Sequence, residues 1–249
     1  MTSERARQAF LRACELDVAV RKPGNVSLAS PGHGMTGAQF IASAQAAAAP
    51  LFAPGQRVGQ RIEAAVAASW AAAGCNTNLG IVLLCAPIAA AVERCAKHGL
   101  RQALEAVLAD LDRDDAAAAF RAITSAQPGG LGQAPAEDVR RAPSVGLREA
   151  MALAAERDSI ARQYVTGFED LFEMALPQLP PGEVTAAGVQ RVFLALLARL
   201  PDSHIVRKHG EAVAQTVMSA AQGWHAQAEA GGVLDDLPAF IAWDEALKA

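Results

Sequence analysis

The longest apolar run in the chain, residues 81–92, follows closely on three small polar residues, Asn76, Thr77 and Asn78. Asn and Thr side chains accept hydrogen bonds from the free backbone N–H groups of a helix's first turn. The run is too short to span a bilayer and contains a proline, so it predicts a buried core helix over residues 79–92. A plain cap needs one polar residue. Three in a row suggest that a ligand is held there, although spare polar loop residues would also explain them.

Helical periodicity recurs along the rest of the chain, whereas the alternation typical of strands does not. Hydrophobic residues make up 52% of the chain and aromatic residues only 5%, which favours close-packed helices over sheets. We expect one all-α domain over residues 1–249, with roughly nine to eleven helices packed around the buried helix. The three clearest apolar stripes are Val189, Val192, Phe193, Leu196, Leu197 and Leu200; Ile160, Tyr164, Phe168, Leu171, Phe172 and Ala175; and Val213, Val217, Ala220, Ala221 and Trp224.

The longest segment without helical periodicity covers residues 126–144. We expect an irregular surface loop there, which either covers part of a site or is a mobile insertion. Its breakers are Pro128, Gly129, Gly130, Gly132, Pro135 and Pro143.

Charge and targeting signals exclude several classes of protein. The formal net charge is −4 and the sequence pI is near 5.8, which argues against a nucleic-acid-binding protein with a basic face. The N-terminal residues are charged throughout and lack the apolar core of a signal peptide. We therefore expect a cytoplasmic protein that binds neither nucleic acid nor membrane.

Residues 202–210, Asp-Ser-His-Ile-Val-Arg-Lys-His-Gly, bring together an acid, a hydroxyl, two imidazoles and two cations. Arg207 and Lys208 suit phosphate binding, whereas Asp202 or Ser203 can simply cap the next helix. The spacing of the histidines fits no zinc motif. The chain has neither a dinucleotide-binding glycine fingerprint nor a P-loop, so a nucleotide would be held by helix ends and side chains.

Two acids stand out from their surroundings. Glu169 shares a predicted helix face with Arg162 and Glu173, opposite the aromatic stripe. That face is either solvated or directed at a site where Glu169 holds a metal or a hydroxyl. Glu63 is the only acid between residues 60 and 74, and it is either exposed or directed inward.

Four segments resemble, in type and order, the triphosphoribosyl-dephospho-CoA synthase family, particularly its archaeal and methylotroph-type members. The segments are KPGNV at 22–26, NTNLG at 76–80, YVTGFEDLFE at 164–173 and DSHIVRKHG at 202–210. The resemblance runs from about residue 12 to about residue 211. It implies a transferase that joins ATP to 3′-dephospho-CoA, or a related acceptor, and releases adenine.

The resemblance also implies residue roles. ATP would arrive with Mg²⁺, whose ligands would be Glu169 and Glu63, and the carboxylates of Glu169, Glu63 and Asp202 would serve catalysis. The binding residues would be Lys22, Asn25, Asn76, Thr77, Asn78, His204, Arg207 and Lys208.

The chain departs from the family pattern in three places. Gly34, Met35 and Thr36 stand where members usually carry acids, and Gly167 replaces an Asp. The family's Asn-Pro-Gly-Thr segment and last apolar helix would begin where this chain ends, at residues 243–249. These departures leave open a non-catalytic nucleotide-binding relative. An alternative is an enzyme of methanopterin-type one-carbon cofactor biosynthesis with a different acceptor. A homodimer is also possible.

Overall fold

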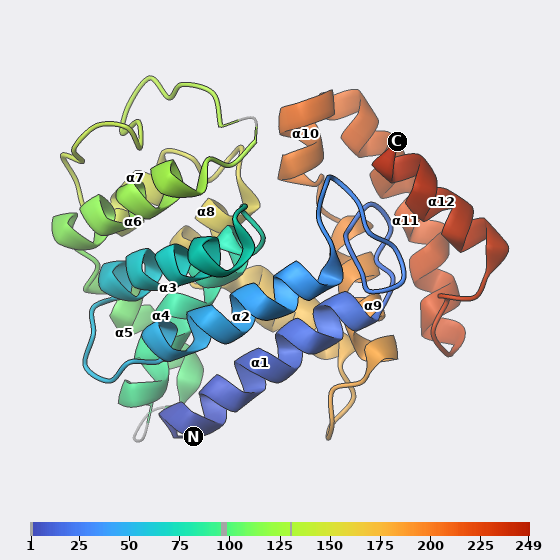
Figure 1. Cartoon of the computed structure of the whole chain (residues 1–249), viewed down its shortest axis with the longest axis horizontal. Helices are drawn as coiled ribbons and strands as arrows, with labels where there is room; N and C mark the ends of the chain where they lie inside the picture. Colours follow the sequence, from blue (N-terminus) through green and yellow to red (C-terminus); the bar gives the residue numbers. More distant parts are fainter. Residues whose placement is uncertain (1, 96–98, 130) are drawn as a thin grey trace. The chain divides into compact units, whose positions relative to one another are not determined.

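The computed structural model describes residues 2–95, 99–129 and 131–249, which form helices joined by loops (Figure 1). Within these ranges the only β feature is an isolated bridge between Gly32 and Met35, so the all-α prediction is confirmed. The elements are α1 (Ser3–Ala19), α2 (Gly37–Leu51), α3 (Val58–Ala73), α4 (Leu79–Arg94), α5 (Leu100–Ala109), α6 (Arg113–Ala126), α7 (Leu147–Ala152), α8 (Ser159–Thr166), the π-helical turn η1 (Leu171–Ala175), the 3-10 turn η2 (Leu176–Gln178), α9 (Ala186–Leu197), α10 (Ser203–His209), α11 (Glu211–Ala230) and α12 (Pro238–Lys248).

The twelve α-helices of the described ranges exceed the roughly nine to eleven expected from the sequence, because some helix boundaries carry no proline. Asp112 begins α6 by accepting hydrogen bonds from the backbone N–H groups of Asp114 and Asp115 at 2.9 and 3.2 Å. Gly210, with φ of +88°, separates α10 from α11. A single capping acid or glycine is therefore enough to divide what reads as one helical stretch.

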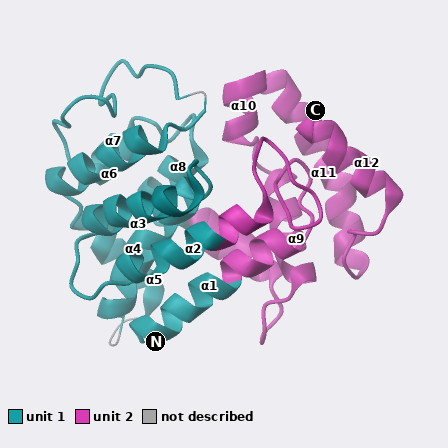
Figure 2. Ribbon diagram, viewed as in Figure 1, with its two compact units in different colours: residues 1–12, 42–168 teal, residues 13–41, 169–249 magenta. Residues whose placement is uncertain are grey.

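The chain divides into two compact units (Figure 2). Unit 1 comprises residues 1–12 and 42–168, and unit 2 comprises residues 13–41 and 169–249. Helices α1 and α2 contribute residues to both units. The expectation of a single domain stays a prediction, and the two units are described separately below.

Unit 1 is built around α4, which packs against α3, α5, α6 and α8. The side chains of Val82, Ala86 and Ala91 on α4 are fully buried. This confirms the central apolar helix that the sequence predicted for residues 79–92. In the described part of the chain, no helix combines the length and apolarity needed to cross a bilayer.

A proline inside α4 is compensated by a tyrosine on α8. Pro87 has no N–H, so it cannot donate to the carbonyl of Leu83 one turn earlier. The hydroxyl of Tyr164, fully buried, donates to that same carbonyl at 2.5 Å. Because a buried carbonyl without a partner is costly, this bond both satisfies the helix and fixes α8 against it.

Unit 2 has its core between α9, α11 and α12. One cluster consists of Leu194, Ala228, Leu234 and Phe240, against which Phe193, Trp224 and Trp243 pack. The Trp224 and Trp243 rings stack with centroids 6.0 Å apart. The stripe predicted for α11 is wrong in part: Val213 is 44% exposed, whereas Val217 and Ala221 are buried as expected.

The helix predicted over residues 160–175 is interrupted. Gly167, with φ of +65°, caps the end of α8, and Phe168 also has a left-handed φ of +64°. A glycine at this position accommodates the left-handed conformation without the strain a larger residue would suffer. Arg162 and Glu169 therefore do not share one helix face, and the expected continuous aromatic stripe is wrong.

Residues 127–129 and 131–144 form the irregular segment that the sequence predicts. Asp138 organises it by accepting hydrogen bonds from the backbone N–H of Ala134 at 3.0 Å and from the backbone and guanidinium of Arg140. The hydroxyl of Thr124 on α6 donates to the carbonyl of Val139 at 3.0 Å, which ties the loop to unit 1. Gly130 lies outside the described residues.

Candidate functional site

The three polar residues before α4, Asn76, Thr77 and Asn78, have different roles. Asn76 caps the helix, since its Oδ1 accepts a hydrogen bond from the backbone N–H of Leu79 at 3.3 Å. Thr77 is anchored to α2 by donating to the hydroxyl of Ser43, itself fully buried, at 2.6 Å. Asn78 is the N-cap residue by backbone position, but its side chain makes no capping bond.

Asn78 is the unusual member of the triplet. Its side chain is 5% exposed, and its Nδ2 has no hydrogen-bond partner in the described ranges of the chain. Buried amide groups nearly always have partners, so a donor in this position points to an acceptor that is not part of the protein. The N-terminus of a helix such as α4 favours negatively charged groups, and a phosphate oxygen would satisfy both features.

In unit 2, residues 22–25 form a tight turn. The backbone N–H of Asn25 donates to the carbonyl of Lys22 at 2.8 Å, with Pro23 and Gly24 as the central residues. Gly24 has φ of +83°, which a type II turn requires at this position. Asn25 is exposed, whereas Lys22 is buried and its ammonium group pairs with the carboxylate of Asp17.

The second polar segment of unit 2 is α10. Asp202 caps it through Oδ1, which accepts from the backbone N–H groups of His204 and Ile205 at 2.7 and 3.1 Å, so the capping alternative holds for Asp202. The guanidinium of Arg207 donates to Nδ1 of His204 at 3.0 Å. Arg207 and Lys208 are exposed at the end of this helix.

The surroundings of His204 disfavour protonation of its imidazole. Burial lowers the pKa of His204, and the cations of Lys208 and Arg207 lower it further. His33 adds to this effect, so the loop that follows the 22–25 turn lies within electrostatic reach of α10. The 22–25 turn and α10 both belong to unit 2.

Comparison with known protein families shows which family the chain belongs to. Residues 3–249 match the model of the ATP:dephospho-CoA triphosphoribosyl transferase family. The chain belongs to this family. The resemblance seen in the sequence is therefore confirmed, and the protein is a triphosphoribosyl-dephospho-CoA synthase-type transferase.

Solved structures agree on the fold. A crystal structure from Archaeoglobus fulgidus, provisionally described as a triphosphoribosyl-dephospho-CoA synthase, is similar with a TM-score of 0.63 and 23% identity. The match covers 85% of this chain and 95% of that chain. No curated protein matches the sequence.

The carboxylates expected to act in this transferase have different surroundings. Both oxygens of Glu63 accept from the guanidinium of Arg121, at 2.6 and 2.7 Å, and this pairing lowers the pKa of Glu63. Glu169 is exposed just after the break that ends α8, whereas its neighbour Asp170 is 3% exposed. Among the described residues, no three His, Cys, Asp or Glu side chains lie close enough to hold a metal ion.

The predicted residues of the transferase are therefore distributed over two units. Unit 1 holds Glu63 and the 76–78 triplet, and unit 2 holds Glu169, the 22–25 turn and the 202–208 segment. That these residues serve one site stays a prediction.

Sequence reasoning missed Ser43 and Ser27. Ser43 is buried and supports Thr77. Ser27 is also buried, and its hydroxyl has no partner among the described residues. The only signal for Ser27 is its place directly after the 22–26 signature.

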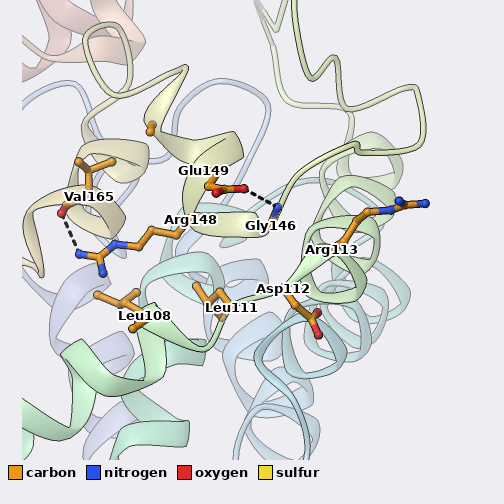
Figure 3. Close-up of a pocket in the computed structure, with 10 residues that line it drawn as sticks. Leu108, Leu111, Asp112, Arg113, Gly146, Arg148, Glu149 and Val165 are labelled. Atoms are coloured by element: carbon orange, nitrogen blue, oxygen red, sulfur yellow. Dashed lines mark hydrogen bonds between the residues drawn. The ribbon is translucent and has the colours of Figure 1, made fainter.

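A surface cavity of about 600 Å³ lies elsewhere in unit 1 (Figure 3). Two of its polar side chains are already engaged: the guanidinium of Arg148 donates to the carbonyl of Val165 at 3.0 Å, and Glu149 accepts from the backbone N–H of Gly146 at 3.1 Å. None of the predicted site residues lines it, so we do not assign it to the transferase reaction. Its lining residues are Leu108, Ala109, Leu111, Asp112, Arg113, Gly146, Arg148, Glu149, Ala152 and Val165.

Proposed function

We propose that the N-terminus of α4 in unit 1 binds a phosphate oxygen of ATP through Asn78 and, separately, that the 22–25 turn and α10 in unit 2 bind phosphate. The main support is the buried Nδ2 of Asn78, which has no partner among the described residues and is a donor at the positive end of a helix. Exposed Asn25, Arg207 and Lys208 suit the second role, since amide and cationic groups bind phosphate oxygens well.

The reaction of the family defines what these groups have to support. The ribose 2′-hydroxyl of dephospho-CoA attacks C1′ of the ATP ribose, and the C1′–N9 bond breaks as the new C1′–O bond forms. The hydroxyl proton passes to a base, and adenine leaves as the neutral base after taking up a proton. We propose Glu169 as the base, since its exposed carboxylate is not committed to capping a helix as Asp202 is.

We further propose that Mg²⁺ enters with ATP as part of the substrate. Magnesium is often bound by one or two carboxylates together with substrate phosphates, so a preformed cluster of protein ligands is not required. Glu169 is available for such a contact. Glu63 would first have to release Arg121, which makes it the weaker of the two predicted ligands.

The binding proposal is tested by titrating MgATP into Asn78→Ala and Lys208→Ala proteins in a calorimeter. We expect Asn78→Ala to weaken binding by about tenfold or more, the size of one lost hydrogen bond to a charged group. Lys208→Ala should weaken it by a smaller factor, because an exposed charge is screened by solvent.

The matched control is Arg94→Gln at the opposite end of α4, where the Arg94–Asp110 ion pair is exposed. Its affinity for MgATP should equal that of the unmodified protein. Native affinity in both test variants would contradict the proposed phosphate contacts.

A further inference from the structure

The backbone on either side of the 22–25 turn is held by side chains that are distant in sequence. The N–H of Gly24 donates to Oδ1 of Asp244 at 2.9 Å, and the carbonyl of Gly24 accepts from Nε2 of His33 at 3.0 Å. Both peptide groups that flank the glycine are therefore fixed. The turn is short and exposed at Asn25, so its shape depends on these tertiary bonds as well as on Pro23.

Arg21, directly before the turn, is held in the same way. Its N–H donates to the carboxylate of Asp235 at 3.1 Å, and its carbonyl accepts from Nε2 of Gln190 at 2.8 Å. Its guanidinium donates to Oδ2 of Asp244 at 2.6 Å. Asp244 thus accepts hydrogen bonds from both Arg21 and Gly24.

Asp244 lies on α12 and is fully buried. Besides Arg21 and Gly24, it accepts hydrogen bonds from the hydroxyl of Ser30 at 2.7 Å and from the ammonium of Lys248 at 3.0 Å. Burial acts to raise the pKa of Asp244, but these donors outweigh it, so the pKa lies below its usual value and the carboxylate is charged. A buried charge with several donors is a strong geometric constraint on each of them.

Helix α12 also packs closely against the loop of residues 24–32. A Cβ on Gly24 would lie 3.2 Å from Cβ of Leu247, and one on Gly32 would lie 3.1 Å from Cδ of Lys248. Two glycines of the loop therefore allow it to approach the helix closely. Lys248 adds a bond from its ammonium to the carbonyl of Ser30 at 3.0 Å.

We infer that Asp244 is the positioning residue for the 22–25 turn, holding the turn in the conformation in which Asn25 contacts substrate phosphate. This inference rests on the proposed function, because it acts through a turn that is proposed to bind ATP. It assigns to α12 a role in substrate binding that its sequence alone does not suggest.

The test compares Asp244→Asn with Asp115→Asn. Asp115 is the matched control: it is a buried carboxylate of unit 1 that likewise accepts from a backbone N–H, that of Gly59 at 2.8 Å, and from an arginine. Each variant is first melted by circular dichroism, and all assays run well below the lowest melting temperature. The readouts are the Kd for MgATP and the KM and kcat of adenine release.

We expect Asp244→Asn to raise the Kd and KM for ATP by about tenfold while kcat changes by less than about threefold, since one turn contact is misplaced and the reacting groups are not. Asp115→Asn should lower the melting temperature and leave the Kd and KM unchanged. Ser30→Ala, which removes one bond to Asp244, should raise the Kd by about threefold. Asp244→Asn with a native Kd and KM overturns the inference.

The variants Ser30→Ala and Asn25→Ala decide the remaining outcomes. If Asp244→Asn does not fold, Ser30→Ala decides alone, and a native Kd in that variant overturns the inference. Asn25→Ala separates the inference from the proposed function. A native Kd in Asn25→Ala shows that the turn does not bind ATP, so the proposed role of the turn and the inference about Asp244 both fail. A weakened Kd in Asn25→Ala together with a native Kd in Asp244→Asn overturns only the inference about Asp244.

Discussion

Partial burial and the cations of Lys208 and Arg207 lower the pKa of His204. Because Arg207 can only donate, Nδ1 of His204 has to accept, which places the proton of the neutral ring on Nε2. An imidazole that accepts from an arginine resists protonation. A neutral His204 can then donate from Nε2 to a phosphate or hydroxyl oxygen.

This arrangement predicts a measurable titration. In NMR spectra, His204 should titrate below its ordinary value of 6.5, and Lys208→Gln and Arg207→Gln should each raise its pKa, because each removes a nearby cation. A pKa at or above 6.5 in the unmodified protein would contradict the account.

The same shift fixes the sign of the effect of pH on stability. The unfolded chain binds a proton at His204 more readily than the folded chain does. The contribution of His204 to folding is therefore complete above pH 6.5. It is lost as the pH falls from 6.5 through the lowered pKa of the folded state.

Some residue roles can be read from the sequence and others cannot. The 76–78 triplet is recognisable as the start of a helix, because capping chemistry is local. That Asn76 makes the cap while Asn78 does not depends on tertiary packing, in which Ser43 of α2 holds Thr77. Asp244 carries no signal in the sequence, since an acid in a short amphipathic helix is usually exposed.

Among the elements, the contact between α4 and α8 makes the sharpest prediction. Tyr164→Phe should lower the free energy of unfolding by about 1–3 kcal/mol, because the carbonyl of Leu83 is left buried without its donor. In a Pro87→Ala background the loss should be smaller, since an alanine at this position supplies the missing N–H to the same carbonyl.

Urea denaturation of the four proteins of this double-mutant cycle measures the effect. Pro87→Ala alone serves as the control for any change in helix propensity. Equal losses for Tyr164→Phe with and without Pro87→Ala would show that the tyrosine does not replace the helical bond.

Helix positions are more predictable than helix interruptions. The helix at 79–92 appears as α4 because an apolar run of that length has few alternatives. The helix expected over 160–175 is broken at Gly167, whose left-handed conformation cannot be seen in a periodic pattern that tolerates single glycines. On α11, Val213 follows the period but lies outside the packed face.

For the whole molecule, the family and the all-α class are predictable from the sequence, whereas the division into units is not. The signature segments are recognisable one by one because each is a short local motif. Unit 2 is assembled from residues 13–41 and 169–249. Hydrophobic periodicity predicts individual helices, but it does not predict which distant segments pack together. The cytoplasmic location stays a prediction, and a homodimer stays open.

As a member of its family, this chain transfers the triphosphoribosyl group of ATP with loss of adenine. The most direct measurement is to incubate the protein with ATP and Mg²⁺, with and without dephospho-CoA, and to follow adenine by chromatography. We predict that adenine appears only when dephospho-CoA is present, in equimolar amount with a triphosphoribosylated product. Binding of ATP without release of adenine in either reaction would contradict the account and favour a non-catalytic relative or a different acceptor.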